Sequence, residues 1–329
     1  MQRRLINIAL IMILMLPSVV SSDAPNHQVN PFPPLSIVSW NMQWLSTGSN
    51  KAIITRTAPD YRQLAGIVRA LSPDILAFQE VNSIDAIQAI LPPSGYKIFL
   101  SDRRHSPTEI FSDINQYTGF AIRNTLPVDD PQDLSTLNVG SYIKGKTKHG
   151  HRATTRKLRY GSYIVIHKGT DAELHLLNVH LKSGCFTRKS KKTSKPCRTL
   201  RRQASALAGW IQQRQDNNEH YIVVGDFNHR LNSRYQWLLT ALNQQLSSPV
   251  YNLTEHVDAA CLVSYRKRDG SRTNRLYRSL IDHAISSKVI AKAIATNGLV
   301  YQHHFTAGEV EKYQLSDHCP LVISFYKTG

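Results

Sequence analysis

Six short apolar segments of this 329-residue sequence are each flanked by polar side chains that can bind a metal ion or move a proton. In chain order these side chains are Asn41, Glu80, His180, Asp226 with Asn228, Asp282, and Asp317 with His318. One such residue alone is usually a turn former or a cap. Six segments together are hard to explain as turns, because Glu and His are not favoured turn residues. The pattern predicts a site assembled at the ends of several strands.

The residue types indicate a hydrolytic centre that uses a hard divalent cation. Oxygen ligands suit Mg²⁺, Mn²⁺ or Ca²⁺ better than zinc, and the sequence offers them at Glu80, Asp226, Asn228 and Asp317. Alternate residues of a strand, such as Asp226 and Asn228, point to the same side. Two histidines and a cation together supply the base, the acid and the electrophile that phosphodiester hydrolysis needs.

The elements that must position these residues are short strands and a few helices. Apolar runs predict strands at 35–40, 75–78, 117–122, 163–166, 174–179, 221–224, 280–285 and 321–325. Helical spacing of apolar residues predicts helices at 61–71 and 200–211. No internal linker divides the chain, so we expect one domain at 35–329 after a polar, proline-containing leader at 23–34. Unevenly spaced strands favour an α/β fold of two packed sheets with helices outside.

Residues 1–22 have the pattern of a secretory signal peptide. Arg3 and Arg4 precede an apolar stretch at 5–16, and small residues at 21–22 offer a cleavage site. A stretch of this length is too short to cross a bilayer, which needs about 20 residues. We therefore expect a secreted or periplasmic protein, with no stable membrane insertion after cleavage. An uncleaved membrane anchor is the alternative.

The four cysteines form an even set, which favours two disulfides in an oxidising compartment. Three pairings are possible. We prefer Cys185–Cys197, because it closes one lysine-rich loop, and this choice leaves Cys261–Cys319. A zinc site made of all four is disfavoured, because the sequence has no short Cys-x-x-Cys pair.

The chain is strongly basic, with 40 Lys and Arg against 23 Asp and Glu and a formal charge of +17. A content of 41% hydrophobic and 19% charged residues excludes a disordered, collagen-like or multi-span membrane protein. The charge favours a polyanionic partner, which is nucleic acid, an anionic membrane or an acidic polymer. A general solubility bias is the other explanation of this charge.

The basic residues are grouped rather than spread. Of the 40, 21 lie in three runs at 144–159, 188–202 and 266–278. The second run begins soon after His180, and a basic loop beside a scissile phosphate would follow a nucleic-acid backbone. The substrate-binding candidates are Lys182, Arg188, Lys189 and Arg198. The alternative is a set of solvated loops.

The sequence resembles the endonuclease/exonuclease/phosphatase superfamily, which includes deoxyribonuclease I, exonuclease III-type enzymes, sphingomyelinases and inositol polyphosphate 5-phosphatases. The resemblance covers 36–325 and rests on six motifs in family order. These are Ser39-Trp40-Asn41, Phe78-Gln79-Glu80-Val81, Asn178-Val179-His180-Leu181, Gly225-Asp226-Phe227-Asn228, Ile281-Asp282-His283 and Ser316-Asp317-His318. It implies a four-layer, deoxyribonuclease I-like α/β sandwich, in which two mixed β-sheets are flanked by helices and the site lies at one edge.

The resemblance also implies a role for each motif residue. Glu80 would be the main ligand of Mg²⁺, or of Mn²⁺ or Ca²⁺, and Asn41 and Asp317 would help to hold the ion. No carboxylate partner of His180 can be placed, because the segment before Gly119 reads Asn-Gln-Tyr.

The proton-transfer and phosphate-binding roles implied by the resemblance fall on the remaining motif residues. Asp226 and Asn228 would position the attacking water and the scissile phosphate. His318 would be the general base, oriented by Asp282. His180 would be the general acid or a donor to a phosphate oxygen.

These observations favour a monomeric, secreted, bacterial-type endonuclease that cleaves DNA with little sequence preference, with RNA as a further candidate substrate. The alternative enzyme acts on a lipid or inositol phosphate, like a sphingomyelinase or a 5-phosphatase. The segment 225–230 resembles the first 5-phosphatase box, but Ile281-Asp282-His283 stands where the second box has Cys-Asp-Arg. A non-catalytic cationic binder is the third hypothesis.

Overall fold

The computed structural model describes residues 32–48, 52–147, 150–186, 194–266 and 271–326. The predicted signal peptide at 1–22 lies outside these ranges, as do the substrate-binding candidates Arg188 and Lys189. Within the described ranges, no helix has the length and apolar content that spanning a bilayer requires.

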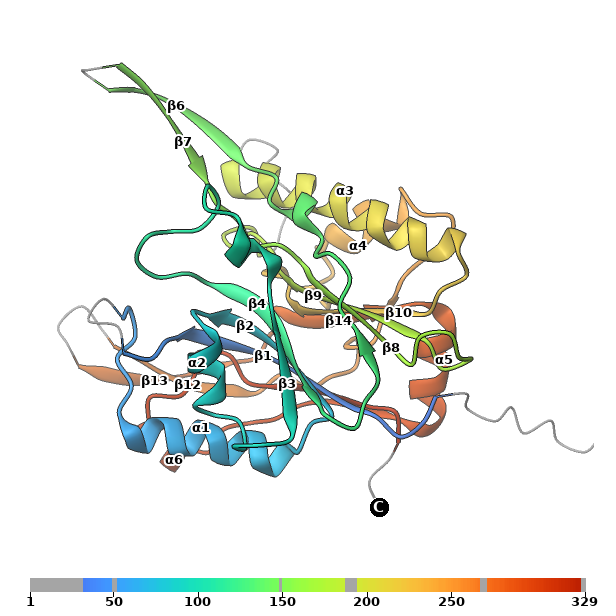
Figure 1. Ribbon diagram of the computed structural model, residues 1–329, viewed down its shortest axis with the longest axis horizontal. Helices are drawn as coiled ribbons and strands as arrows, with labels where there is room; N and C mark the ends of the chain where they lie inside the picture. Colours follow the sequence, from blue (N-terminus) through green and yellow to red (C-terminus); the bar gives the residue numbers. More distant parts are fainter. Residues whose placement is uncertain (1–31, 49–51, 148–149, 187–193, 267–270, 327–329) are drawn as a thin grey trace, which may run out of the picture. The chain divides into compact units, whose positions relative to one another are not determined.

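Two six-stranded mixed sheets form the centre of the fold (Figure 1). The first runs β15 (Leu299–Gln302), β16 (Leu321–Ser324), β1 (Ser36–Leu45), β2 (Ile75–Val81), β4 (Tyr117–Arg123) and β3 (Tyr96–Leu100). The second runs β11 (Tyr251–Asn252), β14 (Asp282–Ser286), β10 (Tyr221–Asp226), β9 (Leu174–His180), β8 (Ser162–Ile166) and β5 (Val128–Asp129). Each sheet has one parallel pair, β1–β2 and β9–β10 respectively, and antiparallel neighbours around it.

Helices cover the outer face of each sheet. The first sheet is covered by α1 (Ala58–Leu71), α2 (Ile84–Gln88) and α6 (Ala307–Lys312), and the second by α3 (Lys195–Asp216) and α4 (Leu238–Asn243). A third apolar cluster lies between the sheets, where side chains such as Ile37 and Phe120 meet Leu176 and Val224. Helix α5 (Lys288–Asn297) contributes to that inner cluster. The predicted four-layer α/β sandwich is therefore confirmed.

The two predicted helices exist and begin earlier than the apolar spacing suggests. Helix α1 starts at Ala58 because Thr57 and Asp60 form a capping box and a proline occupies the first turn. Helix α3 starts at Lys195 because Ser194 accepts a hydrogen bond from Cys197 and Pro196 fits the first turn. Their first turns are polar or basic, so the apolar periodicity does not reveal them.

Two hairpins lie outside the main sheets. One is β6 (Ser141–Thr147) with β7 (Gly150–Arg156), and the other is β12 (Cys261–Arg266) with β13 (Arg272–Tyr277). Their strands carry four of the seven basic residues of the first run and three of the six of the third. Much of the second run lies on the first turns of α3.

Both predicted disulfides are present. Cys185 and Cys197 have Cα atoms 5.1 Å apart, and Cys261 and Cys319 have Cα atoms 5.6 Å apart. The second bridge ties the start of the β12–β13 hairpin to the residue that follows His318.

Candidate active site

Three neighbouring strands of the second sheet place three predicted site residues in one row. Parallel pairing of β9 with β10 sets His180 beside Asp226, and antiparallel pairing of β10 with β14 sets Asp226 beside Asp282. Register between strands, rather than loop structure, therefore fixes the spacing of these side chains.

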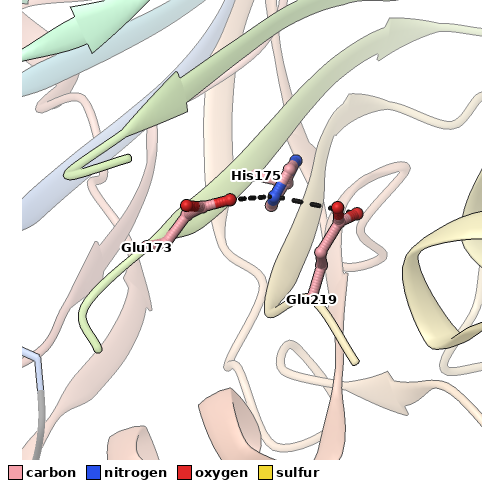
Figure 2. A group of neighbouring side chains, drawn as sticks. All are labelled: Glu173, His175 and Glu219. Atoms are coloured by element: carbon pink, nitrogen blue, oxygen red, sulfur yellow. Dashed lines mark hydrogen bonds and ion pairs between the residues drawn. The ribbon is translucent and has the colours of Figure 1, made fainter. Parts of the chain in front are cut away.

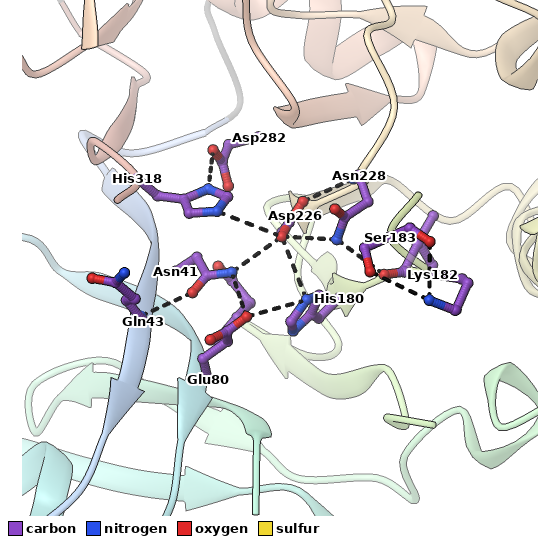
Figure 3. A network of polar contacts seen from close by, with 12 residues as sticks. Asn41, Gln43, Glu80, His180, Lys182, Ser183, Asp226, Asn228, Asp282 and His318 are labelled. Carbon is purple, nitrogen blue, oxygen red and sulfur yellow. Dashed lines mark hydrogen bonds and ion pairs between the residues drawn. The ribbon is translucent and has the colours of Figure 1, made fainter. Parts of the chain in front are cut away.

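The first sheet supplies Asn41 from β1 and Glu80 from β2 (Figure 3). Both strands shift register here, and Glu80 has a left-handed φ of 58°. Such irregularities turn a side chain away from the regular pleat and concentrate at functional sites. The Trp44 amide donates to Glu80 Oε2 at 3.2 Å and fixes the turned carboxylate.

Asp226 is the centre of the polar network and bridges the two sheets. Its Oδ1 accepts from the Asn228 amide at 2.8 Å, and its Oδ2 accepts from the Asn228 and Asn41 side-chain amides at 3.0 and 3.1 Å. His180 Nε2 lies 3.4 Å and His318 Nε2 lies 4.0 Å from the same Oδ2 atom. Burial raises the pKa of Asp226, and the nearby carboxylates add to this effect while His318 opposes it.

His318 and Asp282 form a closely bonded pair, with His318 Nδ1 2.7 Å from Asp282 Oδ2. Burial acts to lower the pKa of His318, but the charge and hydrogen bond of Asp282 outweigh it, so the pKa is raised well above its usual value. The backbone is also fixed, since Trp40 Nε1 donates to His318 O at 2.9 Å and Ser316 Oγ accepts from His318 N at 3.1 Å. The pair is geometrically that of a base and its orienting carboxylate.

His180 has a different environment. It is buried, and its Nε2 faces Glu80 and Asp226 at 3.6 and 3.4 Å. Its Nδ1 is buried without a hydrogen-bond partner among the described residues, so no carboxylate orients this imidazole from behind. Burial, followed by the positive charge of Arg159, holds the pKa of His180 well below its usual value.

The donor set fits a hard divalent cation. Glu80 Oε1 and Asp226 Oδ2 both lie near Asn41 Nδ2, at 3.4 and 3.1 Å, so these two oxygens converge. Asp282, Asp226 and His318 also offer ligand atoms within 4.8 Å of one another. Carboxylate oxygens gathered in a buried place are the ligands that Mg²⁺ and Ca²⁺ prefer.

The two residues expected to help hold the ion differ in their placement. Asn41 turns its amide nitrogen toward the carboxylates, while its Oδ1 accepts from the Gln43 amide at 3.0 Å. Asp317 is 44% exposed in its side chain, and its Oδ1 lies 4.0 Å from His318 Nε2. In this arrangement Asn41 positions the two carboxylates, and its role as an oxygen ligand remains a prediction.

A cleft of about 400 Å³ opens over the network. Its floor includes Asp226, Asn228, Asp282 and His318, and Glu80 and Asp317 also line it. Lys182 and Arg198, the two described substrate-binding candidates, do not line this cleft. Lys182 Nζ instead donates to Ser183 O at 2.9 Å, and Arg198 is exposed in the first turns of α3.

Several contributors to the site escape sequence reasoning. Arg159 counts in the sequence only as a member of a basic run, yet its charge acts on Glu80, Asp226 and His180. Gln79 Nε2 donates to Asn178 Oδ1 at 2.7 Å and links the two sheets behind the site. Gln79 and Asn178 both belong to the motifs, next to Glu80 and two positions before His180, and this placement could have indicated their importance.

A second cluster of histidine and carboxylates lies at the start of β9 (Figure 2). His175 Nε2 is 2.9 Å from Glu173 Oε1 and 3.7 Å from Glu219 Oε2. On the other side of the ring, His175 Nδ1 is 2.5 Å from the Tyr163 hydroxyl, which accepts from Arg214 at 2.7 Å. Arg214 also pairs with Glu219, so internal partners balance this cluster.

Comparison with known proteins gives one family match and several similar structures. A model of the Endonuclease/Exonuclease/phosphatase family matches residues 38–318. No curated protein matches the chain.

The similar structures share the fold at low identity. An endonuclease/exonuclease/phosphatase family protein from Bacteroides thetaiotaomicron is 16% identical, with 89% of this chain and 94% of that chain covered and a TM-score of 0.52. One from Bacteroides vulgatus is 12% identical, with 89% and 98% covered and a TM-score of 0.52. An AP endonuclease from Archaeoglobus fulgidus is 14% identical, with 88% and 98% covered and a TM-score of 0.51.

Proposed function

This chain belongs to the endonuclease/exonuclease/phosphatase family, and on that premise we propose that it is a secreted, divalent-metal-dependent endonuclease. The proposed reaction is hydrolysis of phosphodiester bonds in DNA with little sequence preference, and RNA is a further candidate substrate. The observation that carries the proposal is the meeting of the His318–Asp282 pair with Glu80, Asp226 and His180 at one edge of both sheets.

The His318–Asp282 pair generates the nucleophile. Asp282 holds the Nδ1 end of the ring, which leaves Nε2 directed toward Asp226. The carboxylates around His318 favour its protonated form, and a bound cation would offset their charge and favour the neutral ring. A water within hydrogen-bond distance of both Nε2 and Asp226 Oδ2 would then lose its proton to Nε2 as it attacks phosphorus. The backbone and side-chain amides of Asn228 hold the Asp226 carboxylate in place, so Asp226 can orient the attacking water.

His180 is placed to bind the phosphate, and Asn228 supports Asp226 beside it. Asn228 donates both side-chain N–H groups, to Leu181 O and to Asp226 Oδ2, which fixes Asn228 and Asp226 at the cleft. His180 Nε2 faces the carboxylates and Nδ1 has no orienting partner among the described residues, an arrangement that favours a neutral donor to a phosphate oxygen over an imidazolium acid. This is the second of the two roles that the family resemblance implies.

Glu80 and Asp317, with Asn41 behind them, would hold the cation. When bound, a divalent ion neutralises the negative charge that develops on the phosphate. The two disulfides and the predicted signal peptide support a protein that works outside the cytoplasm. The +17 charge supports a polyanionic substrate such as nucleic acid.

The test is to incubate the purified protein with plasmid DNA and with RNA, in Mg²⁺, Mn²⁺ or Ca²⁺ and in EDTA. We expect nicked plasmid that EDTA prevents, slower cleavage at higher salt, and a loss of at least ~100-fold in His318→Ala. His304→Ala, an exposed histidine outside the site, is the matched control. Release of phosphorylcholine or inorganic phosphate without nucleic-acid cleavage would support the lipid or inositol phosphate alternative instead. Metal-independent DNA binding without turnover would support a non-catalytic binder.

A further inference from the structure

Two exposed aromatic rings line the same cleft as the catalytic residues. Phe186 is 40% exposed and Tyr277 is 37% exposed, and both line the cleft together with Asp226 and His318. Neither ring contributes to the proton transfers described above. Rings that stay accessible beside a polar centre are suited to cover a flat apolar group of the substrate.

The Phe186 backbone is held in place even though its ring is exposed. Its neighbour Cys185 is bridged to Cys197, and Cys185 O lies 2.7 Å from His229 Nδ1. Phe186 O accepts from the Arg230 amide at 2.9 Å. His229 and Arg230 directly follow Asn228, so the Phe186 backbone is fixed relative to Asn228 and to the Asp226 carboxylate that Asn228 contacts.

Tyr277 is tied to the other side of the catalytic centre. It ends β13 and pairs in register with Cys261, which is bridged to Cys319, the residue after His318. The Arg275 guanidinium lies 4.8 Å from the centre of the Tyr277 ring. The Cys261–Cys319 bridge therefore anchors Tyr277 to the residue after His318, whereas the Cys185–Cys197 bridge ties the residue before Phe186 to α3.

Positive charge accompanies both rings. Arg230 is exposed and lines the cleft, and Arg275 and Arg278 are exposed beside Tyr277. Aromatic faces next to arginines are the elements with which proteins bind unstacked nucleic-acid bases and the flanking phosphates. A cleft of about 400 Å³ is at the lower end of the size of small-ligand sites, which suits one nucleotide.

From this arrangement we propose that Phe186 and Tyr277 hold one unstacked nucleobase next to the scissile phosphate, so that the enzyme prefers single-stranded nucleic acid or an unpaired nucleotide. The inference rests on the proposed nuclease function and adds a substrate class to it. A base inside a duplex is stacked on both faces and must leave the helix before it can contact these rings, which costs free energy. Duplex substrates are therefore cleaved more slowly.

The first experiment compares cleavage of one labelled oligonucleotide, free and annealed to its complement, in Mg²⁺. We expect the wild-type protein to cleave the single strand about tenfold faster or more, and Phe186→Ala and Tyr277→Ala each to lose about tenfold in kcat/KM on the single strand. The loss on the duplex should be smaller. Tyr265→Ala is the matched control, since Tyr265 is 43% exposed on the same hairpin and does not line this cleft.

The second experiment measures base binding without turnover. A single strand that contains 2-aminopurine is titrated in EDTA, and its fluorescence reports stacking on an aromatic ring. We expect quenching by the wild type and by Tyr277→Phe, and reduced quenching by Phe186→Ala and Tyr277→Ala. Equal rates on single strand and duplex, or quenching that the two alanine variants leave unchanged, would overturn the inference. Absence of any nucleic-acid cleavage together with normal quenching would instead overturn the nuclease function alone.

Discussion

The two ends of β9 carry the same kinds of residue and differ in how these are partnered. At its start, His175 contacts Glu173 and Tyr163, and Arg214 balances the nearby Glu219. At its end, His180 faces two carboxylates while its Nδ1 has no partner among the described residues. Figures 2 and 3 show the two arrangements.

The balance of charge in each cluster distinguishes a structural role from the proposed catalytic one. In the first cluster every charge has an internal partner, and Arg214 also packs against Tyr163 and Trp210. Both clusters border an open hollow, of about 370 Å³ at the first and about 400 Å³ at the second, and in the second the carboxylates outnumber the nearby cations. Unbalanced charge and perturbed pKa values at a cleft are typical of a functional site.

Substitutions in the two clusters should differ most in their effect on turnover. His318→Ala removes the proposed base, and we expect kcat for plasmid nicking to fall by about 10³-fold. His175→Ala, measured well below its melting temperature, should keep turnover within about twofold, because His175 lies at the other end of β9. Similar losses in both variants would mean that the two clusters cannot be distinguished by function.

The second largest difference should be in stability. Arg214→Ala leaves Glu219 and the Tyr163 hydroxyl without their cation, and we expect the free energy of unfolding to fall by about 3 kcal/mol. Urea unfolding monitored by circular dichroism measures this change. Lys195→Ala, an exposed residue on the same helix, is the control and should change stability by less than about 0.5 kcal/mol. A loss below 1 kcal/mol in Arg214→Ala would contradict the structural role of the first cluster.

His283 is a structural histidine although it directly follows the catalytic candidate Asp282. As in the His175 cluster, both of its ring nitrogens have partners inside the protein. It accepts from the Leu231 amide at 3.2 Å and lies 2.6 Å from Thr254 Oγ1. Burial lowers the pKa of His283 to about 3.

Acid should therefore destabilise the protein through His283. The unfolded chain binds a proton below its ordinary pKa of about 6.5 while the folded chain does not, so stability is complete above that pH. Between pH 6 and pH 4, the proton uptake of His283 in the unfolded chain should lower the free energy of unfolding by about 1.4 kcal/mol per pH unit. His283→Gln should show a shallower loss of melting temperature with acid than the wild type. Parallel curves would show that His283 does not titrate in this way.

Much of the fold and of the site is predictable from the sequence, for a local reason. The site residues directly follow or precede apolar strands, and pairing of those strands brings Asp226 beside His180 and Asp282. The strands themselves are short, continuous apolar runs with clear ends.

The remainder depends on contacts between distant segments. The β12–β13 hairpin is rich in arginine and polar residues, so its sequence lacks the apolar alternation of a buried strand. The turned backbone at Glu80 and the Phe186 and Tyr277 positions at the cleft follow from tertiary packing and disulfides. Arg159 has no sequence pattern that distinguishes it from the other basic residues around it.

The central claim is that the cluster containing Glu80, at the end of β9, performs metal-dependent phosphodiester hydrolysis, and that the cluster containing Glu173, at the start of β9, does not. The most direct test is the single-turnover rate of oligonucleotide cleavage across a Mg²⁺ titration for the wild type, Glu80→Gln and Glu173→Gln. These substitutions remove one carboxylate charge from each cluster and preserve side-chain size. We predict that Glu80→Gln loses at least about 100-fold in rate or needs far more Mg²⁺, while Glu173→Gln follows the wild type. A wild-type Mg²⁺ response in Glu80→Gln, or its loss in Glu173→Gln, would contradict the account.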